Sequence, residues 1–440
     1  MKQDRTSHRP SRRSPYAAIY LLFSRRFGSF WIGSLLSNLG TWMQQIAEPW
    51  LIVTLGGSAI MLGLDGFAMN APVWVLTLLG GVLADTRDRK KVIATFQSIQ
   101  MLCPALLIVL ILTGTVRIWM IIALSLIVGI TDALSMPAFQ SIVPSIVESG
   151  QIGTAIALNS TQFNLSRVLG PAIAGVVMVR YGSVWCFGAN TLSYVPLIVT
   201  VYLIGPVRKV SASLEMKTGA PWIKQILAIG SQPKLRNALL NVLVTGLFCA
   251  PLINFSPILV RNVFHSDALD FGKAVAAFGV GGLIGAVSVL AIEGMVARFK
   301  ISSVAAIAFG ALLVALAANR SLPVVNLLFV LCGAVMTIGN TSANSILQYT
   351  ARDRVRGRTA SLYMLAVRGG LSLGNLITGL SAAYLGIRAA LLINGLLAIL
   401  LQSLIARTST TEDHVEPASR SVEPVQESTE REPWIRKGQR

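Results

Sequence analysis

Long apolar stretches separated by short polar segments run through most of this chain. A helix needs roughly 20 mainly apolar residues to cross a hydrocarbon layer about 30 Å thick. The pattern predicts an all-α integral membrane protein with twelve transmembrane helices. In chain order these spans cover residues 30–56, 61–84, 92–113, 117–139, 153–180, 183–205, 237–261, 272–296, 301–319, 323–347, 357–385 and 387–406.

The first, fifth and eleventh predicted spans contain many Gly, Ser, Thr, Asn and Gln residues. Spans of this composition must face other helices or water rather than lipid. We therefore expect a bundle of helices around a polar path.

The composition agrees with a membrane protein, because 53% of the 440 residues are hydrophobic and only 13% are charged. A soluble domain has about 25% charged residues. The net charge of +18 could indicate a nucleic-acid-binding protein. However, the basic residues lie in short runs between apolar spans, and no zinc-finger, RNA-binding or basic-zipper signature is present. We expect the lipid bilayer, and no nucleic acid, as a partner.

The distribution of Lys and Arg predicts the orientation of the chain in the membrane. Basic residues concentrate before span 1, between spans 2 and 3, between spans 6 and 7, and after span 12. By the positive-inside rule, both termini are then cytoplasmic, and we expect the chain in the bacterial cytoplasmic (inner) membrane. The predicted outer loops hold only Arg117, Arg180, Arg261, Lys273, Arg320 and Arg388.

The chain contains an internal repeat. An ungapped shift places residues 153–182 on residues 357–386, and Leu169, Gly170 and Gly175 each meet an identical residue. Spans 4–5 are thus repeated as spans 10–11, which predicts two parallel six-helix halves, the arrangement of many transporters. The predicted organisation is a basic cytoplasmic segment 1–29, a first bundle 30–205, a cytoplasmic linker 206–236, a second bundle 237–407 and a disordered cytoplasmic tail 408–440.

The residues that commonly carry enzyme or metal chemistry form no such pattern here. The four cysteines fall inside predicted spans without paired spacing, so we expect buried free thiols. The three histidines all lie outside the spans. No catalytic constellation, nucleotide-binding loop, cofactor motif or metal site is visible, so we predict neither an enzyme nor a nucleotide-driven pump.

The segment after span 2, GGVLADTRDRKK, resembles the signature loop of the major facilitator superfamily at Gly81, Leu83, Asp85, Arg89 and Lys90. In that superfamily the carboxylate corresponding to Asp85 closes a cytoplasmic latch against the start of span 11. A helix N-terminus carries about half a positive charge, which suits this role. Gly80 and Gly81 would allow close helix packing. The alternative is that the bases only hold this loop inside.

Three further segments narrow the resemblance. They are GTWMQ at residues 40–44, PAFQ at 137–140 and SRVLGP around Arg167. Together they are similar to the transmembrane secretion effector family, the branch that contains the bacterial enterobactin exporter. Gly170, Pro171 and Gly175 also resemble the span-5 motif of drug–proton antiporters, which implies a hinge biased toward export. Packing of a kinked helix is the alternative explanation of these three residues.

Charged residues inside the spans are costly and are the next candidates for function. Arg167 lies near the middle of span 5, and depth along the helices places Glu48 and Asp132 within its reach. A buried arginine needs a carboxylate partner. Either carboxylate could couple proton entry to substrate exit, or the pair could be structural. We expect Asp65, near the outer end of span 2, to be interfacial.

Span 1 lines the central path in the superfamily, so its polar and polarisable side chains are candidates to contact substrate. Methionine and tryptophan beside amides suit a bulky, partly polar ligand. The candidates are Asn38, Trp42, Met43, Gln44 and Gln45, together with Arg368 in span 11.

Three functions remain open. The first is a secondary transporter that exports small amphipathic molecules, such as drugs or siderophores, by alternating access in exchange for protons. The second is proton-coupled uptake of a nutrient, and the third is a non-transporting sensor or scaffold. We expect a small-molecule substrate, protons as the coupling ion and a functional monomer.

Overall fold

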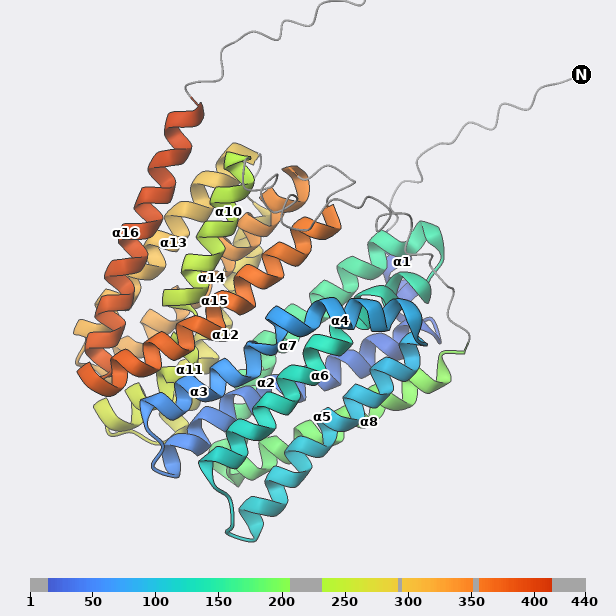
Figure 1. Cartoon of the computed structure of the whole chain (residues 1–440), viewed down its shortest axis with the longest axis horizontal. Helices are drawn as coiled ribbons and strands as arrows, with labels where there is room; N and C mark the ends of the chain where they lie inside the picture. The colour runs from blue at the N-terminus through green and yellow to red at the C-terminus, as the bar shows by residue number, and fades with distance from the viewer. Residues whose placement is uncertain (1–14, 206–231, 292–294, 351–355, 414–440) are drawn as a thin grey trace, which may run out of the picture.

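The computed structural model describes residues 15–205, 232–291, 295–350 and 356–413, and these fold almost entirely into helices (Figure 1). The first bundle contains α1 (Pro15–Leu22), α2 (Phe27–Thr54), α3 (Ala59–Asn70), α4 (Pro72–Thr86), α5 (Arg89–Leu112), α6 (Ile118–Ser145), η1 (Ser149–Gln151), α7 (Ile152–Tyr181) and α8 (Ser183–Leu203). The second contains α10 (Pro233–Val244), η3 (Thr245–Cys249), α11 (Leu252–Ile258), η4 (Leu259–Val263), α12 (Ala268–Leu290), α13 (Met295–Ala318), α14 (Leu322–Thr350), α15 (Arg356–Leu385) and α16 (Ile387–Asp413).

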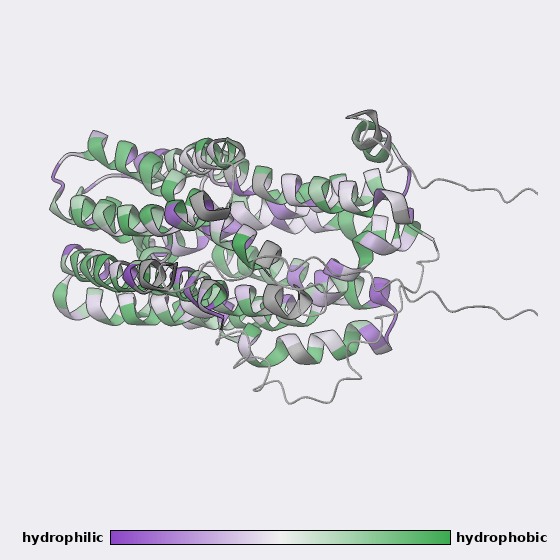
Figure 2. Cartoon of the chain, turned by 90° about the horizontal axis from the view of Figure 1, so that it is seen from above, coloured by the Kyte–Doolittle hydropathy of each residue, from purple (hydrophilic) through white to green (hydrophobic). Residues whose placement is uncertain are grey.

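These helices follow the predicted spans in order. Among the described residues, ten helices are both long and apolar enough to cross a membrane. The two predicted spans outside that set are α2 and α15, which have 28 and 30 residues. At 1.5 Å per residue each is at least about 40 Å long, so composition and not length sets them apart. In Figure 2, hydrophobic residues cover most of the helices, with hydrophilic positions at their ends and at isolated points along them.

Two spans are interrupted helices. The second predicted span consists of α3 and α4, which meet where Pro72 begins the new helix. The seventh consists of α10 and α11 with two π-helical turns, η3 and η4, and it contains Pro251 and Pro257. Proline removes a backbone hydrogen bond and lies at or next to each break, although other helices, such as α7, continue through a proline. The predicted linker lies mostly outside the described residues, and α16 extends beyond the predicted end of the second bundle to Asp413.

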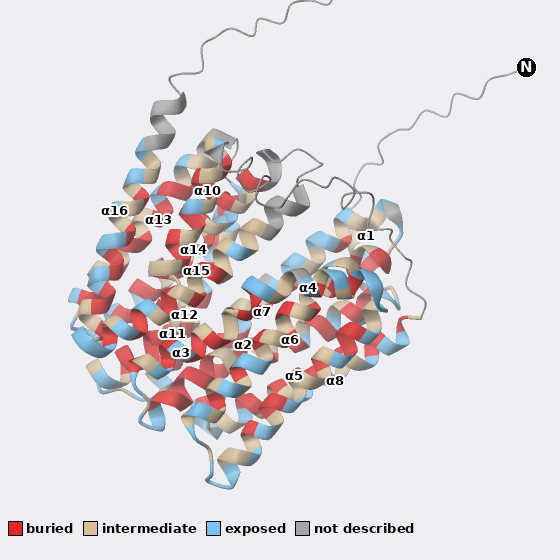
Figure 3. Cartoon of the chain, in the orientation of Figure 1, coloured by how far each residue is buried: buried red, intermediate tan, exposed pale blue. Residues whose placement is uncertain are grey.

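The hydrophobic core shows how the two halves are joined. We call the side at which α2 begins, and at which Arg87 and Asp88 connect α4 to α5, the basic side. Away from that side, one core cluster contains residues of both halves, including Ile52, Phe187, Phe255 and Phe329. On the basic side, the described residues form separate clusters in the first half and in the second half. Buried residues are dense where α2, α3 and α11 meet (Figure 3), and in Figure 1 the halves diverge toward the basic side.

Close contacts between the halves agree with this arrangement. Trp50 of α2 stacks on Phe271 of α12 with ring centroids 5.1 Å apart. The Arg261 guanidinium donates to the backbone oxygen of Val53 over 2.8 Å. All four residues lie on the side opposite the basic side. The structure is therefore closed on that side by contacts between the halves.

Two glycine pairs bring the helix backbones of the halves together. Gly63 of α3 faces Gly379 of α15, and a Cβ added at Gly379 would lie 2.9 Å from the Gly63 Cα. Gly175 of α7 faces Gly272 of α12 in the same manner. Gly175 and Gly379 are equivalent positions of the internal repeat. The two crossings are thus related by the symmetry between the halves.

Candidate functional site

An ion pair joins the two halves near the middle of the molecule. The Arg368 guanidinium of α15 donates to the Asp132 carboxylate of α6 over 2.5 Å. The side chains are 25% and 33% exposed, so neither is fully buried. Asp132 and Arg368 were predicted separately, as a proton-coupling group and a path residue. The structure brings them together as partners.

Arg167 makes a second contact between the halves. Its Nη2 atom donates to the hydroxyl of Thr337 on α14 over 3.2 Å. The predicted pairing of Arg167 with Glu48 or Asp132 is not found. Asp132 pairs with Arg368, and Glu48 interacts with residues of the first half. Residue depth alone suggested the pairing, but the rotation of each helix about its axis turns these side chains elsewhere.

Glu48 and Asp65 form a buried carboxyl pair within the first half. Their exposed fractions are 7% and 6%. The Ser125 hydroxyl of α6 lies between them, within hydrogen-bonding distance of Glu48 Oε1 and 2.6 Å from Asp65 Oδ1. The prediction that Asp65 is interfacial was wrong. Asp65 does lie near the start of the span that α3 begins, but its side chain turns toward Ser125 of α6 and is buried inside the first half.

Two amides extend this carboxyl pair toward α8. The Gln44 side chain donates to Glu48 Oε2 over 2.9 Å, and Asn190 donates to the Gln44 side-chain oxygen over 2.6 Å. A small polar cavity of about 10 Å³ lies beside this network. Such a volume is close to the minimum that holds one water molecule. Its lining residues are Thr41, Gln44, Gln45, Glu48, Met69, Ser125, Val128, Asn190 and Tyr194.

The remaining candidates on span 1 have different surroundings. Asn38 donates to the Gln162 side chain of α7 over 3.3 Å. Trp42 packs edge-on against Phe163 with ring centroids 6.2 Å apart. Met43 is 6% exposed and belongs to the hydrophobic core shared by the halves, so it does not line an open path. Because α2 is a regular helix, neighbouring residues face different directions.

The loop on the basic side is held by several local contacts. Asp88 caps α5 by accepting from the Lys90 backbone N–H over 2.9 Å. The Lys90 ammonium donates to the backbone oxygen of Gly205 over 2.9 Å, and Arg89 Nη1 to that of Ser141 over 3.5 Å. Asp85 is exposed. Its predicted partners at the start of span 11 lie outside the described side chains.

The glycines of this region differ in what surrounds them. A Cβ added at Gly80 would lie 2.7 Å from the Ala133 backbone oxygen of α6, so the expected close packing is present there. Among the described residues, no atom lies within 4 Å of a Cβ added at Gly81. The close approach expected at Gly81 therefore stays a prediction, because the start of span 11 lies outside the described side chains.

The predicted hinge motif lies where α7 contacts two other helices. α7 continues through Pro171 without a break. A Cβ added at Gly170 would lie 2.4 Å from the Cβ atom of Trp42, and one at Gly175 would lie 2.7 Å from the Gly272 Cα. The motif thus packs α7 on α2 of its own half and on α12 of the other half. Close packing is present, and the hinge role stays a prediction.

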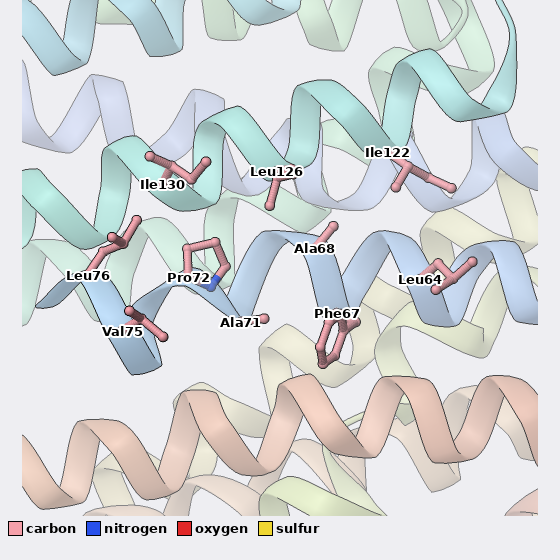
Figure 4. A pocket seen from close by; sticks show the side chains of 10 residues that line it. All are labelled: Leu64, Phe67, Ala68, Ala71, Pro72, Val75, Leu76, Ile122, Leu126 and Ile130. Atoms are coloured by element: carbon pink, nitrogen blue, oxygen red, sulfur yellow. The ribbon is translucent and has the colours of Figure 1, made fainter.

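An apolar groove lies at the break between α3 and α4 (Figure 4). Its volume is about 520 Å³, and its far wall is α6. The lining residues are Leu64, Phe67, Ala68, Ala71, Pro72, Val75, Leu76, Ile122, Leu126 and Ile130. None carries a charged or polar side chain, so the groove is separate from the charged residues described above.

The cysteines and acidic residues provide no metal site in the described part of the chain. Cys103, Cys186, Cys249 and Cys332 are buried free thiols, which confirms the prediction made for them. No group of three or more His, Cys, Asp or Glu side chains among the described residues could hold a metal ion. The candidate site is therefore built from carboxyl, guanidinium, amide and hydroxyl groups.

These features define a helical membrane transporter with two symmetry-related halves and a charged interior. A solved structure of a nucleoside transporter has the same fold, with a TM-score of 0.70 and 13% sequence identity over 87% of this chain and 99% of that one. The transmembrane secretion effector model matches residues 15–432, and the chain belongs to that family. It is not an enzyme.

Two relatives match over nearly their full length. The staphyloferrin A transporter of Staphylococcus aureus is 28% identical, with 81% of this chain and 90% of the relative covered. The multidrug efflux pump Tap of Mycolicibacterium fortuitum is 25% identical, with 84% of this chain and 94% of the relative covered. The predicted family is thereby confirmed.

Proposed function

We propose that this protein exports small amphipathic molecules from the cytoplasm and that protons entering from the opposite side drive the export. The family and the relatives support export: one of those relatives is an efflux pump and another transports a siderophore. The basic side is then the cytoplasmic side of a bacterial inner membrane. A monomer contains both halves and therefore the complete path.

The observation that carries the proton-coupling proposal is the Glu48–Ser125–Asp65 arrangement. Ser125 has one hydroxyl hydrogen, and its oxygen is close to both carboxyl groups and 3.1 Å from the Ile121 backbone oxygen. A serine hydroxyl can donate to only one acceptor at a time. A second carboxyl group can then bond to this oxygen only as a donor, which requires a proton. The pair is therefore suited to hold one transferable proton.

Alternating access gives this proton a role in transport. The halves share a core away from the basic side and have separate described cores on it, which supports a form open toward the basic side. Substrate would enter this form, and a proton bound from the opposite side would accompany the return. Each proton supplies about 1.36 kcal/mol per pH unit and about 2.3 kcal/mol per 100 mV.

The test uses inverted membrane vesicles that contain the protein. An imposed proton gradient, acidic inside, should drive uptake of a fluorescent amphipathic dye, and a protonophore should abolish it. Glu48→Gln replaces the carboxyl by an amide of the same shape and should reduce gradient-driven uptake to the level of vesicles without the protein. Asp270→Asn is the matched control, because Asp270 is paired at 3.0 Å with Lys273 away from the site.

Accumulation of the dye in right-side-out vesicles or cells that grows with the proton gradient would mean uptake and would contradict export. Export that is unchanged in Glu48→Gln would contradict proton coupling through the carboxyl pair. The second outcome requires that the variant is present in the membrane at the wild-type level.

A further inference from the structure

Two polar contacts cross between the halves at similar depth. Asp132 of α6 meets Arg368 of α15, and Thr337 of α14 meets Arg167 of α7. Each of the four residues lies in the middle part of its helix. The side chains therefore face the region where a transporter of this fold must hold its substrate during alternating access.

The internal repeat relates these two contacts to each other. The shift that superimposes the halves places Asp132 one residue from the position of Thr337, and Arg368 within one helical turn of that of Arg167. One contact thus joins the fourth span to the eleventh, and the other joins the tenth to the fifth. They are equivalent positions on opposite sides of the central path.

The two contacts differ in charge. Arg368 has a carboxylate partner at 2.5 Å, whereas the equivalent partner of Arg167 is an uncharged hydroxyl at 3.2 Å. Among the described residues, no carboxylate lies within ion-pair distance of Arg167. No described side chain therefore balances the charge of this guanidinium.

An unbalanced cation inside a membrane protein is energetically costly. A guanidinium presents several N–H donors in a plane, a geometry that matches a carboxylate in a two-point contact. The partner of Arg167 is the uncharged Thr337, whereas the equivalent partner in the other contact is Asp132. This arrangement suits a site in which a bound molecule supplies the negative charge that balances Arg167.

We propose that Arg167 binds a carboxylate of the transported molecule and that the substrates of this protein are therefore organic anions with an apolar part. This inference rests on the proposed transport function and narrows its substrate class. Because Thr337 is neutral, the Arg167 guanidinium stays available to the substrate. An acidic residue at position 337 would form an ion pair with Arg167 instead. The Asp132–Arg368 pair supplies a polar contact of no net charge on the other side of the path.

The test measures binding without any gradient, so it is independent of direction and coupling. Purified protein in detergent is titrated with pyrenebutyrate, pyrenebutanol and pyrenebutylamine, which share one apolar part and differ in charge. Wild type should bind the carboxylate at least about tenfold more tightly than the alcohol or the amine, because only the carboxylate forms the ion pair. Titrations are repeated without chloride.

Three variants separate the charge effect from folding. Thr337→Asp introduces the missing acid and should abolish the preference for the carboxylate, as should Arg167→Gln. Thr337→Asn introduces a side chain of nearly the same size as aspartate but without its charge, and this variant should retain the preference for the carboxylate. Thermal unfolding without probe identifies any variant that is misfolded. If a variant is misfolded, the comparison of the three probes on the wild-type protein still tests the proposal.

Equal binding of the three probes, or no binding of any of them, would overturn the proposal. So would a carboxylate preference that persists in Thr337→Asp. A preference seen only without chloride would assign the site to a small inorganic anion and would also overturn it. Loss of gradient-driven transport with intact carboxylate preference would instead contradict only the proposed export mechanism.

Discussion

Gly175 of α7 lies so close to Gly272 of α12 that a Cβ atom added at Gly272 would be 2.5 Å from the Gly175 Cα. The contact joins the two halves on the side opposite the basic side. Any opening of that side must separate these backbones. The pair is therefore a sensitive place to alter the balance between the two open forms.

We predict that Gly175→Ala shifts the protein toward the form that is open on the side opposite the basic side. The added methyl group overpacks a backbone contact, which typically costs 1–3 kcal/mol, on the order of a tenfold or greater change in the equilibrium. Spin labels at Thr115 and Arg320, both exposed on that side of the two halves, should report a longer distance.

Gly188→Ala is the matched control for this experiment. Gly188 lies within α8, and no atom of the described residues would lie within 4 Å of a Cβ there. Both substitutions raise helix propensity by a similar amount, so only the contact between the halves differs. An unchanged label distance in Gly175→Ala would mean that this crossing does not limit opening.

Asp65→Asn should uncouple transport from the proton gradient while the protein remains folded. The amide keeps the shape of the side chain and leaves Ser125 with one carboxyl neighbour, Glu48, so the pair can no longer share a proton. Gradient-driven dye uptake in inverted vesicles should fall at least severalfold, and binding of the dye should change little. Asp270→Asn should behave as wild type, and a fully active Asp65→Asn protein would falsify the shared-proton arrangement.

Asp85→Asn should leave the protein in the membrane but reduce transport several-fold. A carboxylate near a helix N-terminus contributes on the order of 1 kcal/mol, enough to change the ratio of the two open forms by about fivefold. Asp85 is exposed in this form, in which the described cores of the halves are separate on the basic side. Full transport by a normally expressed variant would leave the loop with only a topological role.

The orientation can be tested by labelling single cysteines in a background without the four native ones. Thr86 and Ser321 are exposed and lie at opposite ends of the molecule. We predict that Thr86→Cys reacts with an impermeant maleimide only in inverted vesicles and that Ser321→Cys reacts only in intact cells. Reaction of both positions from one side would contradict the topology of two parallel halves.

Much of the fold was predictable because membrane helices are selected by length and hydrophobicity along the chain. The predicted spans correspond in order to the helices, and the least apolar ones include α2 and α15. Helix interruptions were less evident. Each of the spans that contain Pro72 and Pro251 is one apolar stretch in the sequence, although its helix is interrupted next to that proline.

The candidate site was predictable as a set of residues but not as a set of partners. The charges inside apolar spans identified Glu48, Asp132, Arg167 and Arg368. Asp65 carried the same signal and was misassigned because it lies close to the end of its span, although its side chain points inward. Ser125 and Thr337 had no signal, since single hydroxyl residues are common in spans and acquire meaning only from their neighbours.

The sequence by itself determined that this is a helical membrane protein with an internal repeat, because bilayer thickness and hydrophobicity act on residues in chain order. The tertiary structure alone decided that Glu48 meets Ser125 rather than Arg167 and that Asp132 meets Arg368. These contacts depend on how each helix is rotated and crossed against its neighbours. Glycine crossings such as that of Gly175 with Gly272 set those positions, and a one-dimensional pattern does not encode them.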